Sequence, residues 1–282
     1  MISSVATIAG LREKVADARM AGKAVGLVPT MGALHEGHLS LMRRARSEND
    51  LVVASIFVNP PQFGPTEDLQ RYPRNLARDL ALAAGAGVDV SFCPEPDEMY
   101  PPGFATWVEV EGLGERLCGA SRPRHFRAVT TVVAKLLDVC QPDRAYFGLK
   151  DAQQFVIIRR MVQDLNIPVE LVGCPTVREA DGLAMSSRNL YLTPDERAQA
   201  PALYRALQAA EAAVAGGVRD VAEIKREMNE FLAQATLGDV EYVEVVGTDG
   251  LLPVARVEGE CLIALAARFG GTRLIDNVFV RG

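Results

Sequence analysis

Residues 24–58 decide the fold and read AVGLVPTMGALHEGHLSLMRRARSENDLVVASIFV. The stretch begins with a short apolar run over 24–28, which Pro29 is expected to end, and it closes with a nearly continuous β-branched run over 51–58. Between these runs, apolar side chains recur at helical spacing over 39–45. Strand, helix and strand in this order predict a βαβ unit with a right-handed crossover.

The same alternation continues to about residue 175. Helix-like patterns cover 11–21, 76–84, 130–139 and 152–165. Strand-like patterns cover 88–92, 144–147 and 169–172. This order predicts an α/β fold, in which a Rossmann-like parallel sheet carries helices on both faces.

The pattern changes near Pro175. Thr193-Pro194-Asp195-Glu196 is a helix start, with an N-cap hydroxyl, a proline at the first position and acids in the first turn. That helix is expected to reach Gly216, and a second helix to span 221–235. Three strand-like runs follow, over 240–246, 261–266 and 273–280. The sequence therefore predicts a domain over 1–175 and a smaller C-terminal α+β domain over 176–282, with two helices and a three-stranded sheet.

The composition restricts the partners of the chain. Of its 282 residues, 49% are hydrophobic, while 30 basic and 36 acidic side chains leave a net charge of -6. An acidic chain lacks the broad basic face of a nucleic-acid binder. No apolar run approaches the roughly 20 residues of a membrane span. Five scattered cysteines without a C-x-x-C pair favour a reducing compartment. We expect a soluble, cytoplasmic protein without nucleic-acid or membrane partners.

Two of the three histidines lie in the loop that follows the first strand of the βαβ unit. His35 and His38 are three residues apart, so on a helical turn they share one face. Open α/β sheets bind ligands where such a loop joins the carboxyl end of a strand to a helix. Unpaired backbone N–H groups and two imidazoles are therefore expected to converge on an anion such as a triphosphate.

The histidine pair also allows plainer interpretations. A zinc site would have only His125 left as a third histidine ligand, and either histidine alone could be a cap or a buried core residue. G-x-G-x-x-G is missing from the loop, and no Walker motif occurs anywhere in the chain. A nucleotide would therefore bind through a different motif.

Three further stretches could join this site. The loop over 55–64 carries two neutral amides, Asn59 and Gln62, which suit the hydroxyls of a small substrate. Residues 147–154 include Lys150, whose charge suits a phosphate, and residues 185–189 carry two hydroxyls and a guanidinium. The alternatives are a rigid turn, a capped helix with a surface lysine and a solvated loop. Convergence on one predicted sheet edge favours the functional interpretation.

Together these stretches resemble the pantothenate synthetase (pantoate–β-alanine ligase) family, an adenylate-forming group whose fold is shared with class I aminoacyl-tRNA synthetases. The resemblance covers nearly the whole chain. Its segments are the histidine signature over 28–41, the substrate loop over 55–73, the Gly-x-Lys-Asp element over 147–154, the counterpart of the KMSKS loop over 185–189, and Leu-Ile-Asp-Asn over 274–277. Cys118 stands where many members carry a glutamate, and Arg124 and Ala128 replace glycines.

The resemblance implies a reaction in two steps. ATP and pantoate would give an enzyme-bound pantoyl adenylate and pyrophosphate, with Mg²⁺ required, and the amine of β-alanine would then displace AMP to give pantothenate. It also implies a homodimer, with the domain over 1–175 binding nucleotide and pantoate and the domain over 176–282 closing as a lid. The ligands of Mg²⁺ stay unknown, with Asp79 as one candidate.

The resemblance also assigns site residues. The catalytic residues would be His35, His38, Lys150 and Arg188, with His38 as proton donor. Pantoate and β-alanine would meet Asn59, Gln62, Tyr72, Arg122 and Gln154. The ATP site would comprise Pro29, Met31, Gly32, His35, Gly37, His38, Gly148, Leu149, Lys150, Asp151, Val177, Met185, Ser186, Ser187 and Arg188.

Three other functions compete with this one. A nucleotidyltransferase would act on a dianionic phosphate acceptor, so its site should carry extra Arg or Lys where this chain offers Asn59, Gln62 and Gln154. A tRNA synthetase would need more basic surface than the short second half offers. A nucleotide sensor would have no need of intact His38 and Lys150.

Overall fold

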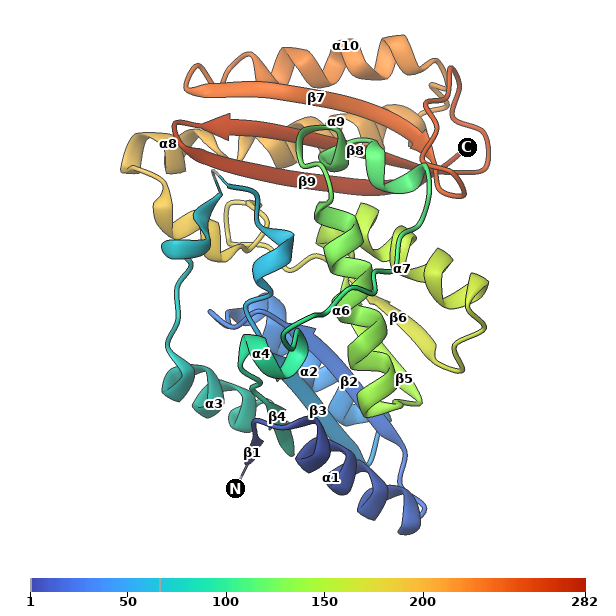
Figure 1. Cartoon of the computed structure of the whole chain (residues 1–282). Helices are drawn as coiled ribbons and strands as arrows, with labels where there is room; N and C mark the ends of the chain where they lie inside the picture. Colours follow the sequence, from blue (N-terminus) through green and yellow to red (C-terminus); the bar gives the residue numbers. More distant parts are fainter. Residues whose placement is uncertain (1, 66) are drawn as a thin grey trace. The chain divides into compact units, whose positions relative to one another are not determined.

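A computed structural model of the chain describes residues 2–65 and 67–282, which form two compact units (Figure 1). The first unit comprises Met1–Glu115, Gly119–Leu149 and Ile157–Pro175. The second comprises Arg116–Cys118, Lys150–Val156 and Thr176–Gly282. The second unit thus takes in two short segments that precede residue 175 in the sequence.

The first unit is built on a parallel sheet with the strand order β1-β4-β3-β2-β5-β6. Its strands are β1 (Ser3–Val5), β2 (Val25–Thr30), β3 (Leu51–Ile56), β4 (Val90–Phe92), β5 (Arg144–Gly148) and β6 (Glu170–Cys174). The helices up to residue 164 are α1 (Ile8–Met20), α2 (Glu36–Glu48), α3 (Leu76–Gly85), α4 (Pro96–Met99), α5 (Cys118–Ser121), α6 (His125–Cys140) and α7 (Ala152–Asp164).

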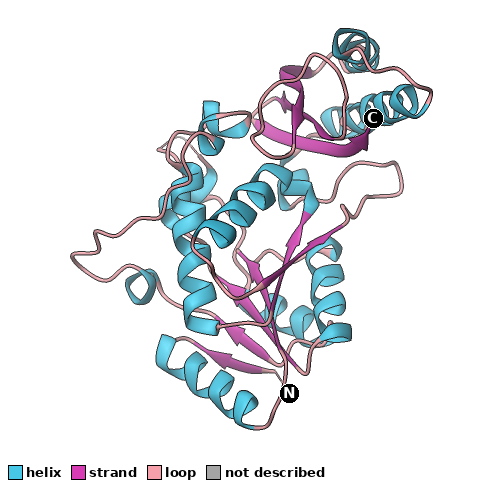
Figure 2. Cartoon of the chain, turned by 90° about the vertical axis from the view of Figure 1, so that its right-hand side faces the viewer, coloured by secondary structure: helices cyan, strands magenta, loops and turns pink. Residues whose placement is uncertain are grey.

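Helices cover both faces of this sheet. The pair α1 and α6 packs on one face, and α2 and α3 pack on the other (Figure 1). Figure 2 shows the same arrangement, with the strands enclosed between helices. On the face of α2, Met42 and Ala45 meet Val28, Val52 and other apolar side chains of the strands. The predicted α/β fold with a parallel, two-sided sheet is confirmed.

The structure corrects the expected end of β2. Pro29 was predicted to stop the strand, but it lies inside β2 and pairs in register with Ser55 of β3. On its other side β2 pairs with β5 only at Gly26 and Leu27. The prediction was wrong because a proline lacks only a donor, and at this position β2 has a neighbour on just one side.

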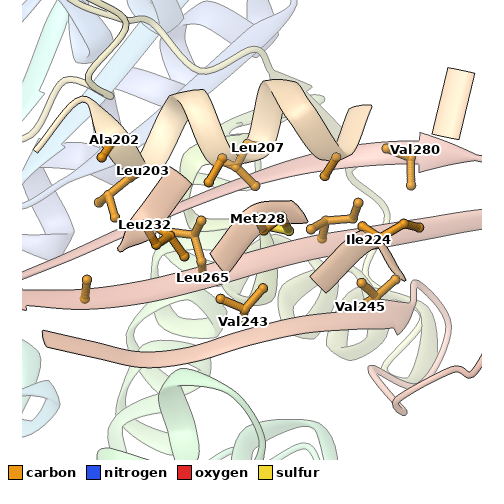
Figure 3. Close-up of a cluster of buried hydrophobic side chains, with 14 of the residues drawn as sticks. Ala202, Leu203, Leu207, Ile224, Met228, Leu232, Val243, Val245, Leu265 and Val280 are labelled. Carbon is orange, nitrogen blue, oxygen red and sulfur yellow. The ribbon is translucent and has the colours of Figure 1, made fainter. Parts of the chain in front are cut away.

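The second unit has an antiparallel sheet of β7 (Gly238–Gly247), β8 (Glu260–Phe269) and β9 (Thr272–Arg281), in that order. Its helices are α8 (Pro194–Gln199), α9 (Ala202–Ala215) and α10 (Val221–Leu232). Figure 3 shows side chains of α9 and α10, among them Leu207 and Met228, packed on the sheet residues Val243, Val245 and Leu265. The predicted smaller C-terminal α+β unit is confirmed.

One predicted helix of this unit is two helices. Thr193 caps α8 as expected, because its hydroxyl accepts from the N–H of Glu196 and the Glu196 carboxylate accepts from the N–H of Thr193. The helix ends at Gln199, and α9 begins after Pro201. The prediction of one helix reaching Gly216 was wrong because a proline in a helix interior removes a backbone hydrogen bond and clashes with the preceding turn.

Arg124 immediately precedes α6 with a left-handed backbone, at φ 67°. Its side chain is exposed, so a glycine there would lose no packing. We expect Arg124→Gly to raise the free energy of unfolding by about 0.5–1 kcal/mol, because glycine adopts this conformation without the clash of a Cβ. Urea unfolding checks this prediction, with Arg124→Ala as the control. Equal stabilisation by alanine would show that the backbone conformation is not the cause.

Candidate active site

The loop between β2 and α2 is held by hydrogen bonds to neighbouring elements. The Thr30 hydroxyl donates to the carbonyl of Ser55 at 2.6 Å and accepts from the N–H of Gly32 at 3.3 Å. Asp79 of α3 is 2% exposed, and its two carboxylate oxygens accept from the N–H groups of Ala33 and Leu34, each at 2.9 Å. These bonds fix the path of the chain from the sheet into α2.

The same loop requires a glycine. Gly32 has φ +80°, and a Cβ on it would lie 3.0 Å from Asp79 Oδ2 and 3.2 Å from Ile56 Cγ2. A larger residue would therefore suffer both backbone strain and crowding. The conformation at Gly32 brings the following N–H groups onto the Asp79 carboxylate.

His35 and His38 stand at the start of α2 with their rings 4.1 Å apart. The Nδ1 atom of His35 accepts from the N–H of Gly37 at 3.1 Å, and the Nδ1 atom of His38 accepts from the N–H of His35 at 3.3 Å. A nitrogen that accepts carries no proton, so each neutral ring holds its proton on Nε2. Both rings are half-buried and present Nε2–H groups as hydrogen-bond donors.

This arrangement corrects one expectation about the anion site. Unpaired backbone N–H groups were expected at the start of the helix, yet those of His35 and Gly37 donate to the two imidazoles, and that of His38 donates to the carbonyl of His35 at 2.8 Å. The expectation was wrong because the histidines themselves cap the helix, as serine and glutamate do in a capping box. The donors offered to an anion are the imidazole edges.

The loop after β3, which is the predicted substrate loop, places Gln62 next to Met31 of the loop between β2 and α2, called the histidine loop from here on. The Gln62 side-chain amide lies 2.9 Å from Met31 Sδ, and its oxygen accepts from Asn59 Nδ2 at 3.0 Å. Asn59 is 1% exposed, and it also donates to the carbonyl of Ala128 and accepts from the Tyr100 hydroxyl at 2.6 Å. Asn59 therefore supports Gln62 from the interior.

The predicted substrate residue Arg122 is paired with a half-buried carboxylate, that of Glu67. Its guanidinium binds both oxygens of Glu67, at 2.7 and 2.6 Å. Burial raises the pKa of Glu67, but the hydrogen bonds and charge of Arg122 together outweigh burial, so that pKa lies below its ordinary value. The positive charge of Arg122 is thus already balanced within the first unit.

His125 joins this cluster to the substrate loop. Its Nδ1 lies 2.8 Å from the carbonyl oxygen of Gln62, and its Nε2 lies 3.0 Å from Arg122 Nη1. Because a carbonyl only accepts and a guanidinium only donates, His125 is neutral with its proton on Nδ1. This histidine positions the backbone of Gln62.

The predicted site residues divide between the two units. The first unit holds Pro29, Met31, Gly32, His35, Gly37, His38, Asn59, Gln62, Tyr72, Arg122, Gly148 and Leu149. The second unit holds Lys150, Asp151, Gln154, Val177, Met185, Ser186, Ser187 and Arg188. Within the first unit, Met31 contacts Gln62, and the ring of His35 lies beside that of His38. Tyr72 is buried against Phe63, with ring centroids 5.8 Å apart.

In the second unit, Ser186 caps a short 3-10 helix, η5 (Ser187–Tyr191), by accepting from the N–H of Arg188 at 3.2 Å. Lys150 lies in another 3-10 turn, η4 (Leu149–Asp151), just before α7. Within the stretch over 185–189, residues 187–189 therefore belong to a helical turn that Ser186 caps. The cap and the helical turn fix the backbone of Ser186, Ser187 and Arg188.

Among residues 2–65 and 67–282, no group of three or more His, Cys, Asp or Glu side chains is placed to hold a metal ion. Asp79, the magnesium candidate, directs both carboxylate oxygens to backbone N–H groups. The described residues therefore do not fit a resident metal. In the same part of the chain, no helix has the length and apolar character needed to cross a membrane.

A family model described as pantoate-beta-alanine ligase matches residues 3–279. The chain belongs to this ligase family. The pantothenate synthetase of Moorella thermoacetica is 58% identical over 272 residues, which cover 96% of each chain. That of Heliobacterium modesticaldum is 59% identical over 259 residues, or 92% of each chain.

Solved structures agree with the family assignment. A pantothenate synthetase from Thermus thermophilus has a TM-score of 0.94 and 51% identity, with complete coverage of both chains. A pantoate-beta-alanine ligase from Francisella tularensis, complexed with beta-gamma ATP and beta-alanine, has a TM-score of 0.81 and 34% identity over 99% of this chain and 97% of that one. The fold and the family of the chain therefore agree.

The sequence analysis did not identify several residues that shape the candidate site. Glu67 was not singled out, His125 was considered only as a third zinc ligand, and Asp79 only as a magnesium ligand. Each acts through a partner at least 45 positions away in the sequence. The sequence offered only a weak signal for two of them: Glu67 is an acid in the predicted substrate loop, and Asp79 is an acid in the helix that follows it.

Proposed function

We propose that the protein uses ATP to join pantoate to β-alanine, giving pantothenate, AMP and pyrophosphate. The observation that carries this proposal is the family match over residues 3–279. The ATP and beta-alanine bound to the related ligase from Francisella tularensis support the same substrates here. The loop with the paired histidines supplies donors suited to the phosphates.

In the first step, a carboxylate oxygen of pantoate attacks the α-phosphorus of ATP, and the bond to pyrophosphate breaks. Pantoate supplies the nucleophile, so the protein needs neither a catalytic serine nor a cysteine. Its task is to align the reactants and to stabilise negative charge on the phosphate oxygens. The Nε2–H groups of His35 and His38, together with Lys150 and Arg188, are assigned this role.

In the second step, the amine of β-alanine attacks the acyl carbon of pantoyl adenylate, AMP leaves, and the amine loses a proton. Gln62 is the residue best placed to orient the acyl group, because its amide lies beside Met31 and is supported by Asn59. Neutral amides bond hydroxyl and carboxylate groups without a charge that must be desolvated. Tyr72, Arg122 and Gln154 are assigned to the same substrate region.

Other parts of the assignment are proposals of finer detail. The second unit, which carries Lys150 and Ser186–Arg188, is proposed to close over the adenylate and shield it from water. Mg²⁺ is proposed to arrive with ATP, bound by phosphate oxygens and water. The homodimer and the cytoplasmic location remain predictions, as does the boundary at residue 175.

We expect Gln62→Ala to raise the KM values of pantoate and β-alanine about tenfold, because loss of one or two hydrogen bonds to substrate costs about 1.4 kcal/mol. The KM of ATP should change less than about twofold. Steady-state kinetics with each substrate varied in turn checks this prediction. An effect confined to ATP would contradict the assignment of Gln62 to pantoate.

The test of the proposed function is the exchange of labelled pyrophosphate into ATP, measured with Mg²⁺ and without β-alanine. Exchange that requires pantoate would establish the acyl adenylate and the acid that forms it. Release of AMP should then begin when β-alanine is added. Exchange that does not depend on pantoate would overturn the proposal and favour another acceptor. No exchange, with ATP still bound, would overturn it and favour another acceptor or a nucleotide sensor.

A further inference from the structure

Two adjacent polar residues, Asp276 and Asn277, are buried in the edge strand β9 of the second unit. They are 3% and 8% exposed. Side chains alternate along a strand, so Asp276 shares the face of Leu274 and Val280, which belong to the apolar core, while Asn277 points to the opposite face. A buried carboxylate in such a place is costly unless it is paired.

The partner of Asp276 is Arg178. Two guanidinium nitrogens of Arg178 meet the two carboxylate oxygens at 2.6 and 3.0 Å. Arg178 also donates to the carbonyl of Gly182 at 3.1 Å, and its guanidinium carbon lies 3.8 Å from the ring centroid of Tyr204 in α9. A bidentate pair fixes both the distance and the plane of the arginine. Asp276 therefore holds Arg178 in one orientation.

Arg178 begins a tight hairpin that leads into the stretch over 185–188. Within the hairpin, the N–H of Glu179 donates to the carbonyl of Leu183 at 2.8 Å, and the N–H of Met185 donates to the carbonyl of Val177 at 3.0 Å. Gly182 is at φ +92°, and a Cβ there would come within 2.2 Å of Tyr204. The hairpin thus transmits the position of Arg178 to Met185.

The far end of the same stretch is tied back to the hairpin. Asn189 donates to the Glu179 carboxylate at 2.8 Å and to the carbonyl of Ala184 at 3.1 Å. Glu179 in turn pairs with Arg197 of α8 at 2.6 Å. Ser186, Ser187 and Arg188 are therefore held between two anchored points.

Asn277 holds a different piece of the proposed ATP site. Its side-chain amide donates to the backbone carbonyl of Lys150 at 2.8 Å. Because the buried Asn277 amide fixes the backbone of Lys150, it also fixes the position from which the lysine side chain extends. One strand, β9, thus supports Lys150 on one face and the hairpin before Met185 on the other.

We propose that Asp276 and Asn277 are positioning residues that hold Lys150 and Ser186–Arg188 in one fixed frame for the triphosphate of ATP. This inference rests on the proposed function, which assigns Lys150 and Arg188 to ATP. A buried ion pair adds little stability over apolar packing. The consequence of this one is therefore geometric, because the pair sets the approach of two phosphate-binding segments.

Asn277→Ala tests the proposal most directly. It removes the donor to the Lys150 carbonyl and leaves the core face of β9 intact. We expect the KM of ATP in pyrophosphate exchange to rise about tenfold, the effect of one lost hydrogen bond in a buried site. The KM of pantoate should change less than about threefold, because most of its proposed contacts lie in the first unit.

The ion pair needs two variants. Asp276→Asn leaves the Arg178 charge buried without its partner, so it is expected to lower the folded fraction as well. The double variant Arg178→Gln with Asp276→Asn removes both charges and keeps a polar side chain at each position. We expect this double variant to fold. Its KM for ATP should still rise about tenfold, because the bidentate hydrogen bonds between Arg178 and Asp276 are lost.

Two reference variants distinguish positioning from stability. Met228→Ala destabilises the core of the same unit without touching the hairpin, and per folded molecule both KM values should stay at wild type. Lys150→Ala, assayed by pyrophosphate exchange, reports whether Lys150 acts on ATP at all. If Lys150→Ala slows exchange but Asn277→Ala and the double variant leave the KM of ATP unchanged, the positioning role is overturned. If Lys150→Ala is also without effect, the proposed function of Lys150 fails and the inference with it.

Discussion

Replacing His38 with asparagine is expected to slow pyrophosphate exchange about 10²–10³-fold, the cost of losing one preorganised donor at a developing negative charge. The Nδ1 atom of His38 accepts from the N–H of His35, and Nε2 is left as the donor. An asparagine oxygen can take the place of Nδ1 and keep the helix cap. The variant therefore removes the Nε2–H group with little loss of structure.

His38→Gln is the matched control. A glutamine oxygen at N3 can accept from the N–H of His35, as it does in a capping box, while its amide nitrogen extends toward the position of Nε2. We expect this variant to retain more exchange activity than His38→Asn and to lose less than about 1 kcal/mol of stability, because the cap is kept. Pantoate binding, measured by calorimetry, should be nearly the same in both variants. If His38→Asn exchanges at the wild-type rate, His38 is only a cap.

The architecture of the chain was predictable because hydrophobic periodicity reports burial directly. The β-branched run over 51–56 and the helical spacing in α2 already define the βαβ unit, and the structure has both. The two errors concern prolines. Pro29 lies within a strand because β2 has a neighbour on only one side at that position. Pro201 separates two helices because a continuous helix would need the backbone N–H that proline lacks.

The site was predictable only where its residues are close in sequence. His35 and His38 stand in one turn, so their spacing shows that they share a face. The residues that support the site are distant in sequence: Glu67 and Arg122 are separated by 55 positions, and Arg178 and Asp276 by 98. No local pattern indicates such pairs, because they form only when the packing of the elements brings the chain segments together.

The capping role of the histidines shows a second limit of sequence analysis. The pattern indicated a helix start with free N–H groups, which is the usual anion site. Only side-chain geometry shows that the imidazoles occupy those groups. The donors proposed to bind the anion are therefore the Nε2–H groups and not the backbone N–H groups, and both histidines stay assigned to phosphate as a proposal.

Asp79→Asn is expected to be the most damaging single change near the histidine loop. The carboxylate of Asp79 accepts from two N–H groups, those of Ala33 and Leu34. An asparagine offers one acceptor and turns a donor toward the other N–H. We expect a loss of about 2–4 kcal/mol in the free energy of unfolding, because a charge-assisted hydrogen bond is lost and a buried donor is left unsatisfied.

Activity should fall further than stability alone explains, because the displaced loop carries His35 and His38. Asp89→Asn is the control, since its carboxylate accepts from the N–H of Val52 at 2.8 Å, at the amino ends of the strands and away from this loop. Urea unfolding and pyrophosphate exchange per folded molecule check both variants. If Asp79 instead bound Mg²⁺, a higher Mg²⁺ concentration would restore exchange in Asp79→Asn. We expect no restoration, because the structure gives both carboxylate oxygens to the backbone.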